Sequence, residues 1–184
     1  MIIGRVVSVN VGLPRDVVWK GHSVRTGIFK EPVTGRVRVR TLGLEGDRQA
    51  DLTVHGGPQQ AVYAYPSEHY EFWKKKLGRA QLMWGMFGET LTTQGLLEDT
   101  VRIEDEYHVG SATVVVTRPR TPCYKLDIKF GTMDMVKEFQ ASGRSGFYLS
   151  VKQEGDVGVG DTIELISSDK SKTKISELFL EQVK

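Results

Sequence analysis

The sequence predicts a mainly β protein that closes into a barrel, with α-helices at its periphery. Short runs of alternating apolar and polar residues recur along the 184-residue chain, and this alternation is typical of half-buried strands. Clusters of glycine, proline and aspartate separate the runs. A β-rich chain with few helices must bury its strand edges, and closure of the sheet is a common solution.

The expected strands extend over most of the chain. They lie at Ile3–Val9, Val33–Arg40, Ala61–Tyr65, Val101–Glu104, Ala112–Thr117, Phe147–Lys152 and Thr162–Ile166. Turn signals lie at Gly43–Asp47, Gly56–Pro58, Gly143–Gly146 and Gly155–Asp161. Helices do not separate these strands regularly, and the chain has no phosphate loop or dinucleotide glycine pattern, which disfavours repeating βαβ units.

Helices are expected at three places. Ser67–Leu77 has an apolar stripe and ends at Gly78, and Thr132–Ala141 begins at a threonine that can cap its first turn. The apolar stripes, which we interpret as core, contain Tyr70, Trp73, Leu77, Met133, Val136 and Phe139. Lys174–Lys184 has helical spacing and is expected to pack on the barrel or on a second copy of the chain. The expected organisation is a barrel domain over residues 1–167 followed by a helix over residues 174–184.

Composition excludes several classes of protein. Apolar residues make up 39% of the chain and the net charge is +2, which provides no global field for nucleic acid or an anionic membrane. The amino-terminal residues resemble no signal peptide, and no apolar stretch approaches the roughly 18 residues of a membrane span. We therefore expect a cytoplasmic protein with no membrane or nucleic-acid partner. A single cysteine excludes an intrachain disulfide and multi-cysteine zinc.

That single cysteine, Cys123, lies in the segment RPRTPCYKL. Pro119 and Pro122 stiffen the backbone on its approach, which suits a metal ligand or a nucleophile. Nearby positive charge, which favours a thiolate, comes from Arg118, Arg120 and Lys125. The alternative is a buried and unreactive thiol at a strand end.

A second candidate group is found in GLEGDRQADLTVHGG, residues 43–57. Asp47, Asp51 and His55 lie between glycine turns, and Gly56 and Gly57 allow a ligand to approach the backbone or an anion to bind in a nest of amides. The alternative is structural, with Asp47 capping a turn and His55 satisfied inside the fold.

Two further polar features have structural alternatives. Glu89, in GMFGETLTTQGL, can orient a site residue or cap backbone amides, and we favour the second role. The run VTGRVRVR places Arg36, Arg38 and Arg40 on one face, but it lacks the interleaved aromatic residues of a base-stacking surface. A solvated strand face is therefore the better interpretation.

Taken together, these segments resemble the MOSC family, the domain named after the carboxy-terminal part of molybdenum cofactor sulfurase, and in particular its short stand-alone bacterial members. The resemblance covers roughly residues 20–166. It rests on an ordered set of motifs, TGIFKEPV, GLEGDRQAD, HGGPQQAVYAY, FGETLTTQGL, RPRTPCYKL, SGFYLSV and GVGD. The family fold is a β-rich barrel with peripheral helices, in agreement with the strand pattern.

The resemblance implies a molybdenum cofactor of the molybdopterin type, with Cys123 as the protein thiolate ligand to the metal. Thiolate is a soft ligand that suits a redox-active metal. The anionic phosphate of the pterin needs cations and backbone amides. The matching candidates are the turn at residues 55–57, Lys30, Arg120 and Arg25.

The reaction that the resemblance implies is reduction of N-hydroxylated compounds, including hydroxylaminopurines, to amines. Asp47, His55 or Glu89 could relay a proton, and the sequence does not choose among them. Because the chain has no iron–sulfur, flavin or haem motif, a separate electron-donor protein is expected.

Two other functions stay open. Cys123 could carry a persulfide for sulfur transfer, although no pyridoxal-phosphate desulfurase domain accompanies it, or the barrel could be a non-catalytic carrier of the cofactor. Longer members of the family have a further helical module after the barrel, and here only Lys174–Lys184 follows it. This difference leaves open any electron-partner docking or dimer contact that the longer members build with this module, and with it whether the protein forms a homodimer.

Overall fold

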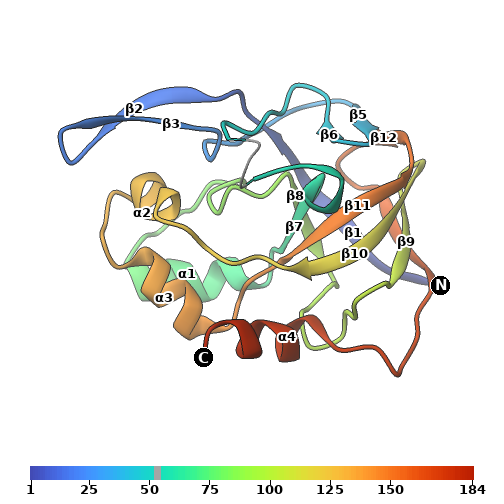
Figure 1. The fold of residues 1–184 in the computed structure, drawn as a ribbon. Coiled ribbons are helices and arrows are strands. Elements are labelled where there is room, and N and C mark those ends of the chain that lie inside the picture. Colours follow the sequence, from blue (N-terminus) through green and yellow to red (C-terminus); the bar gives the residue numbers. More distant parts are fainter. Residues whose placement is uncertain (52–54) are drawn as a thin grey trace.

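The computed structural model describes residues 1–51 and 55–184 and contains a closed barrel of seven strands (Figure 1). The barrel strands, in chain order, are β1 (Ile2–Val11), β7 (Val62–Pro66), β8 (Leu91–Gln94), β9 (Glu106–Val109), β10 (Ala112–Pro119), β11 (Phe147–Gln153) and β13 (Thr162–Ser167). Their order around the barrel is β13-β9-β10-β11-β7-β8-β1, and β1 pairs back with β13. The prediction of a mainly β barrel is confirmed.

Most neighbouring strands in the barrel are antiparallel, whereas β7 and β8 are parallel. A parallel pair needs a long crossover, and the segment between β7 and β8 contains α1 (His69–Leu77). This crossover places a helix and a loop outside the barrel wall. Residues 85–90 of that loop return to β8 and contribute to the hollow described below.

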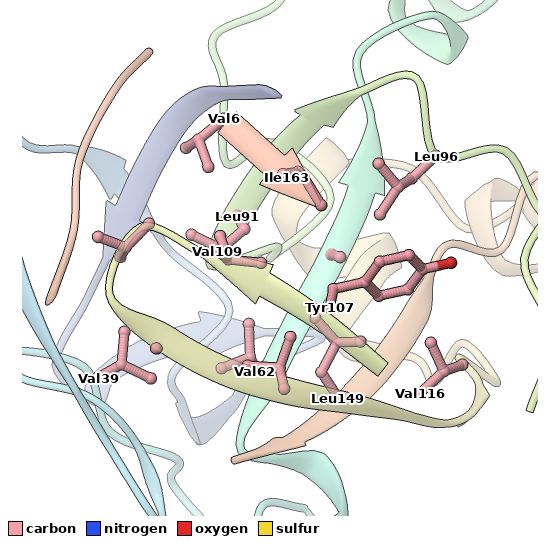
Figure 2. Close-up of a cluster of buried hydrophobic side chains, with 14 of the residues drawn as sticks. Val6, Val39, Val62, Leu91, Leu96, Tyr107, Val109, Val116, Leu149 and Ile163 are labelled. Carbon is pink, nitrogen blue, oxygen red and sulfur yellow. The ribbon is translucent and has the colours of Figure 1, made fainter. Parts of the chain in front are cut away.

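The barrel interior is filled by branched aliphatic side chains. Figure 2 shows Val62, Leu91, Val109, Leu149 and Ile163 pointing toward one another from different strands. Each is at most 3% exposed. The strands alternate inward and outward residues, so one face of each strand builds this core. The barrel is therefore a packed core, and a ligand must bind outside it.

A second core is aromatic and lies between the barrel wall and the helices. Besides α1, the helices on this side are α2 (Lys125–Phe130) and α3 (Met135–Ser142) (Figure 1). Trp73 is fully buried, stacks on Phe139 at 6.0 Å between ring centroids, and donates its indole N–H to Tyr65 Oη at 2.7 Å. This cluster fixes the helices against β7, which also supplies Tyr63 to the hollow.

Short accessory elements attach to the barrel. The hairpin of β2 (Arg15–Trp19) and β3 (His22–Thr26) extends away from the barrel in Figure 1. Beside it, β4 (Glu31–Pro32) pairs with β1, and a small sheet contains β5 (Val37–Arg40), β6 (Gly43–Leu44) and β12 (Gly155–Val157). The expected terminal helix is α4 (Ile175–Gln182), which packs on the barrel through the buried Ile175 and Phe179.

Several local predictions were wrong. Val101–Glu104 is a turn, not a strand, because Asp105 Oδ2 accepts the amide of Arg102 and closes that turn; the strand begins at Glu106. Within Val33–Arg40, a strand forms only over β5. The helix expected from Thr132 starts at Met135, and Met133 is 64% exposed. The sequence pattern did not predict α2, the β2–β3 hairpin or β8.

In the part of the chain that the structure describes, no helix has both the length and the apolar character needed to cross a membrane.

Candidate functional site

A hollow opens on the side of the barrel where β7 and β11 meet the helices. It contains about 640 Å³ free of protein atoms, a volume that includes open solvent at its mouth. Its wall comes from segments far apart in the sequence, and includes Lys30, His55, Tyr63, Arg120, Cys123 and Tyr148. Basic, aromatic and sulfur-bearing side chains thus face one space.

Cys123 lies just before α2, in the wall of the hollow. Pro119 is the last residue of β10 and Pro122 is buried, so the backbone leaves the barrel in a constrained path before α2 begins. The amide of Leu126 donates to the Cys123 carbonyl at 2.9 Å and closes the first turn. The thiol is half-buried, with its Sγ 3.6 Å from His55 Nε2. It is not sealed in apolar packing.

The side chain of His55, which lies next to the predicted glycine turn, contacts the thiol of Cys123. Burial lowers the pKa of His55, the positive charges of Lys125 and Arg120 lower it further, and Asp51 opposes them. The imidazole is therefore mainly neutral at neutral pH. Its Nδ1 atom is buried and has no hydrogen-bond partner among the described residues. An unpaired buried nitrogen in the wall of a hollow can accept or donate one hydrogen bond to a ligand.

Arg120 is a buried cation without a carboxylate partner among residues 1–51 and 55–184. It is only 6% exposed, and its guanidinium lies 4.9 Å from the ring centroid of Tyr63 and 5.2 Å from that of Phe139. One guanidinium nitrogen donates a long hydrogen bond of 3.4 Å to Tyr63 Oη. A guanidinium stays charged, and a buried charge needs a partner of opposite sign. The hollow is therefore suited to an anion.

Lys30 and Asp47 form a buried ion pair at the edge of the hollow. Lys30 is in the wall, whereas Asp47 lies behind it and also accepts the amide of Gly12 at 2.9 Å. Burial lowers the pKa of Lys30 and raises that of Asp47, and each charge partly opposes the shift of the other. The pair ties the segment before β4 to the segment after β6, which gives Asp47 a positioning role.

Glu89 is fully buried and does not reach the wall of the hollow. Its carboxylate accepts hydrogen bonds from the amides of Gly85 at 2.9 Å and Phe87 at 3.0 Å, from Thr92 Oγ1 at 2.9 Å and from the hydroxyl of Tyr70. Burial raises the pKa of Glu89, and these hydrogen bonds oppose that shift. The carboxylate organises the loop before β8, as the favoured structural interpretation proposed.

The structure does not bring Arg25, Gly56 or Gly57 into the wall of the hollow. Arg25 is on the β2–β3 hairpin, is exposed, and pairs with Asp16 at 3.1 Å. Gly56 and Gly57 have φ of 83° and 80°, a left-handed conformation that favours glycine. These glycines turn the chain beside His55, and their role toward a ligand stays a prediction.

Sequence reasoning missed several wall residues. Tyr63 and Tyr148, from β7 and β11, were expected only as strand residues, and Gln49, Gln60, Thr90 and Thr121 add polar atoms. Burial raises the pKa of both tyrosine hydroxyls, and the charge of Arg120 opposes this shift. Strand alternation does not separate an aromatic ring at a ligand site from one in the core. The signal in the sequence that could have identified Tyr63 and Tyr148 as wall residues is that both lie in motifs on which the family resemblance rests.

The contact between Cys123 and His55 predicts that the thiol reacts more slowly with an alkylating agent in a His55→Asn variant. A hydrogen bond of this kind contributes about 1 kcal/mol, so the rate of alkylation by iodoacetamide at pH 7 should fall about fivefold. Intact mass gives the rate directly, because Cys123 is the sole cysteine in the sequence. His22→Asn, on the exposed hairpin, is the matched control and should leave the rate unchanged. Equal rates in the His55 variant and the unmodified protein would contradict this role.

The comparisons with known proteins agree with the fold and the motifs. The sequence profile of the MOSC domain matches residues 51–164. The YflK protein of Bacillus subtilis is 45% identical over 162 residues, which are 88% of this chain and 73% of that protein. A protein of Gibberella moniliformis named "Reductase" is 32% identical over 149 residues, 79% of this chain but 26% of that much longer protein.

A solved structure extends the likeness to the fold. The crystal structure of YiiM from Geobacillus stearothermophilus superposes with a TM-score of 0.81 at 34% identity, over 98% of this chain and 84% of that chain. The resemblance predicted from the motifs is thereby confirmed. The profile match, the relative from Bacillus and this structure together establish that the chain belongs to the MOSC domain family.

Proposed function

We propose that the protein is a molybdenum-cofactor-dependent reductase that converts N-hydroxylated compounds, including hydroxylaminopurines, to amines. The MOSC family is associated with binding of the molybdenum cofactor. The observation that carries the proposal is the half-buried thiol of Cys123 in one hollow with the buried and uncompensated guanidinium of Arg120. A soft donor beside an anion-binding cation matches a thiolate-ligated metal whose organic part bears a phosphate.

The residues in the wall fit such a cofactor in four respects. Cys123 Sγ would ligate the metal, and Arg120 and Lys125 would hold the anionic part. The ammonium group of Lys30 is already neutralised by Asp47, so Lys30 would contribute hydrogen bonds more than net charge. The unpaired Nδ1 of His55 would bind a polar atom of the cofactor or substrate. The cofactor, when bound, supplies the two-electron redox centre.

The reaction balances as R–NHOH + 2 e⁻ + 2 H⁺ → R–NH₂ + H₂O. The N–O bond breaks, the nitrogen is reduced, and the oxygen leaves as water. Among Asp47, His55 and Glu89, we favour His55 as the residue that moves a proton, through Nδ1 or Nε2. Its imidazole is in the wall and mainly neutral, whereas both carboxylates lie behind the wall and already accept several hydrogen bonds.

The test uses protein made in a host that synthesises the cofactor. We expect one molybdenum and one pterin per chain, and stoichiometric conversion of a hydroxylaminopurine to the amine when dithionite supplies the electrons. Metal-free protein with full reductase activity would overturn the proposal. A stable gain of one sulfur atom on Cys123 after incubation with a sulfur donor, without bound pterin, would favour sulfur transfer instead. Pterin that binds and exchanges without any turnover would favour a carrier.

A further inference from the structure

The basic side chains on the small β5–β6–β12 sheet and those around the hollow differ in whether a carboxylate lies next to them. Beside the small β5–β6–β12 sheet, the arginines that the sequence marked as a basic face are all paired with carboxylates. Arg36 contacts Asp161 at 3.0 Å, and the two other pairs are Arg38–Asp156 at 3.3 Å and Arg40–Glu154 at 3.4 Å. That face therefore carries little net charge, and a solvated surface explains it.

Around the hollow, in contrast, four basic side chains have no carboxylate partner among the described residues. We define the basic rim as Arg15, Arg48, Arg118 and Lys129. Among the described residues, none of these four side chains has an ion pair within 4.0 Å. Residues 52–54, which the structure does not describe, are leucine, threonine and valine and carry no charge. Arg118 lies 5.8 Å from the ring centroid of Tyr148, and Arg48 precedes Gln49; both Tyr148 and Gln49 are wall residues. The rim thus adjoins the hollow.

Two of these cations share one aromatic ring. Arg15 lies 3.8 Å and Lys129 4.9 Å from the centroid of Phe29, which stands between the wall residues Ile28 and Lys30. Burial lowers the pKa of Lys129, and the charges of Glu89 and Glu31 oppose this shift, whereas the charge of Arg15 lowers the pKa further. Two like charges held together are unfavourable, and an acidic partner would relieve the repulsion.

Resting on the proposed function, we propose that the basic rim is the docking surface for an acidic electron-transfer protein. The reduction consumes two electrons, and the chain has no redox motif of its own to supply them. A donor seated on the rim would lie over the open mouth beside Cys123 and close to the redox centre. Complementary charge accelerates the encounter of two such proteins and makes it sensitive to salt.

The same surface fits a nucleic acid less well. Binding of single strands combines cations with aromatic faces on which bases stack. Here the ring of Phe29 is already engaged by Arg15 and Lys129, and Tyr148 faces both Arg118 and the hollow. Tyr124, 52% exposed, is the remaining aromatic side chain next to Cys123. One ring does not make a stacking platform, so we favour the protein partner.

The experiment compares two reductants with cofactor-loaded protein. A reduced acidic flavodoxin serves as the protein donor, and dithionite serves as a small reductant that needs no docking. In the double variant Arg15→Glu, Arg48→Glu, we expect the flavodoxin-driven rate at low salt to fall at least tenfold and its salt dependence to flatten. The dithionite-driven rate, the molybdenum content and the melting temperature should stay within experimental error of the unmodified protein.

The matched control is Arg38→Glu, Arg40→Glu, which reverses the same number of charges on the paired face and should leave both rates unchanged. Equal loss in both double variants, or no loss in the rim variant, would overturn the docking proposal. So would salt-dependent binding of a short oligothymidylate that requires the rim while the flavodoxin-driven rate does not. Unmodified protein that fails with dithionite itself overturns the proposed function, which separates the two failures.

Discussion

Replacing Cys123 with serine should remove molybdenum from the purified protein and lower reductase activity at least about 100-fold. Loss of a group that only orients a metal ligand costs about 10–100-fold, and loss of the ligand itself costs more. Serine keeps the size of the side chain but replaces a soft thiolate with a hard hydroxyl that stays protonated near neutral pH. Metal content by mass spectrometry and turnover of a hydroxylaminopurine measure the two effects.

The fold should tolerate this substitution. Cys123 is half-buried, and its thiol contacts His55 without joining the core, so the melting temperature should change by no more than about 2 °C. Met133→Ser is the matched control, because it removes an exposed sulfur outside the hollow and should leave metal and activity intact. A Cys123→Ser protein with a full complement of molybdenum would contradict the proposal that Cys123 ligates the metal.

Replacing Glu89 with alanine should have the largest effect on stability. The substitution leaves two amides, the Thr92 hydroxyl and the Tyr70 hydroxyl without their acceptor inside the protein, and each buried unpaired donor costs about 1–3 kcal/mol. Partial relaxation and entry of water reduce the sum, so we expect a loss of about 4 kcal/mol in the free energy of unfolding, or roughly 10 °C in melting temperature. Thermal and urea unfolding measure it.

The variant Glu89→Gln separates a structural role from a proton relay. An amide keeps one acceptor oxygen but turns an NH₂ group toward the donors, so a structural role predicts intermediate stability and activity lost only as far as the protein unfolds. A stable Glu89→Gln protein without activity would instead assign Glu89 to proton transfer. Glu71→Ala, an exposed carboxylate on α1, is the matched control and should cost less than about 0.5 kcal/mol.

The sequence alone determined the fold class and the family, and it singled out Cys123 as a candidate. Period-two alternation marks most barrel strands, such as β10 and β11, because one face of each strand must enter the core. A solitary cysteine between prolines and cations stood out by composition. The ordered motifs by themselves identify the family.

Tertiary structure decided which candidates share a site. His55 and Cys123 are 68 residues apart, yet their side chains lie 3.6 Å from each other. Arg25, another candidate, instead pairs with Asp16 and does not line the hollow. Glu89, for which the sequence favoured a structural role, is enclosed by donors from its own loop, from α1 and from β8. The sequence lists charges without their partners, whereas burial and pairing depend on barrel closure, and these decide which charges are left to bind a ligand or a partner.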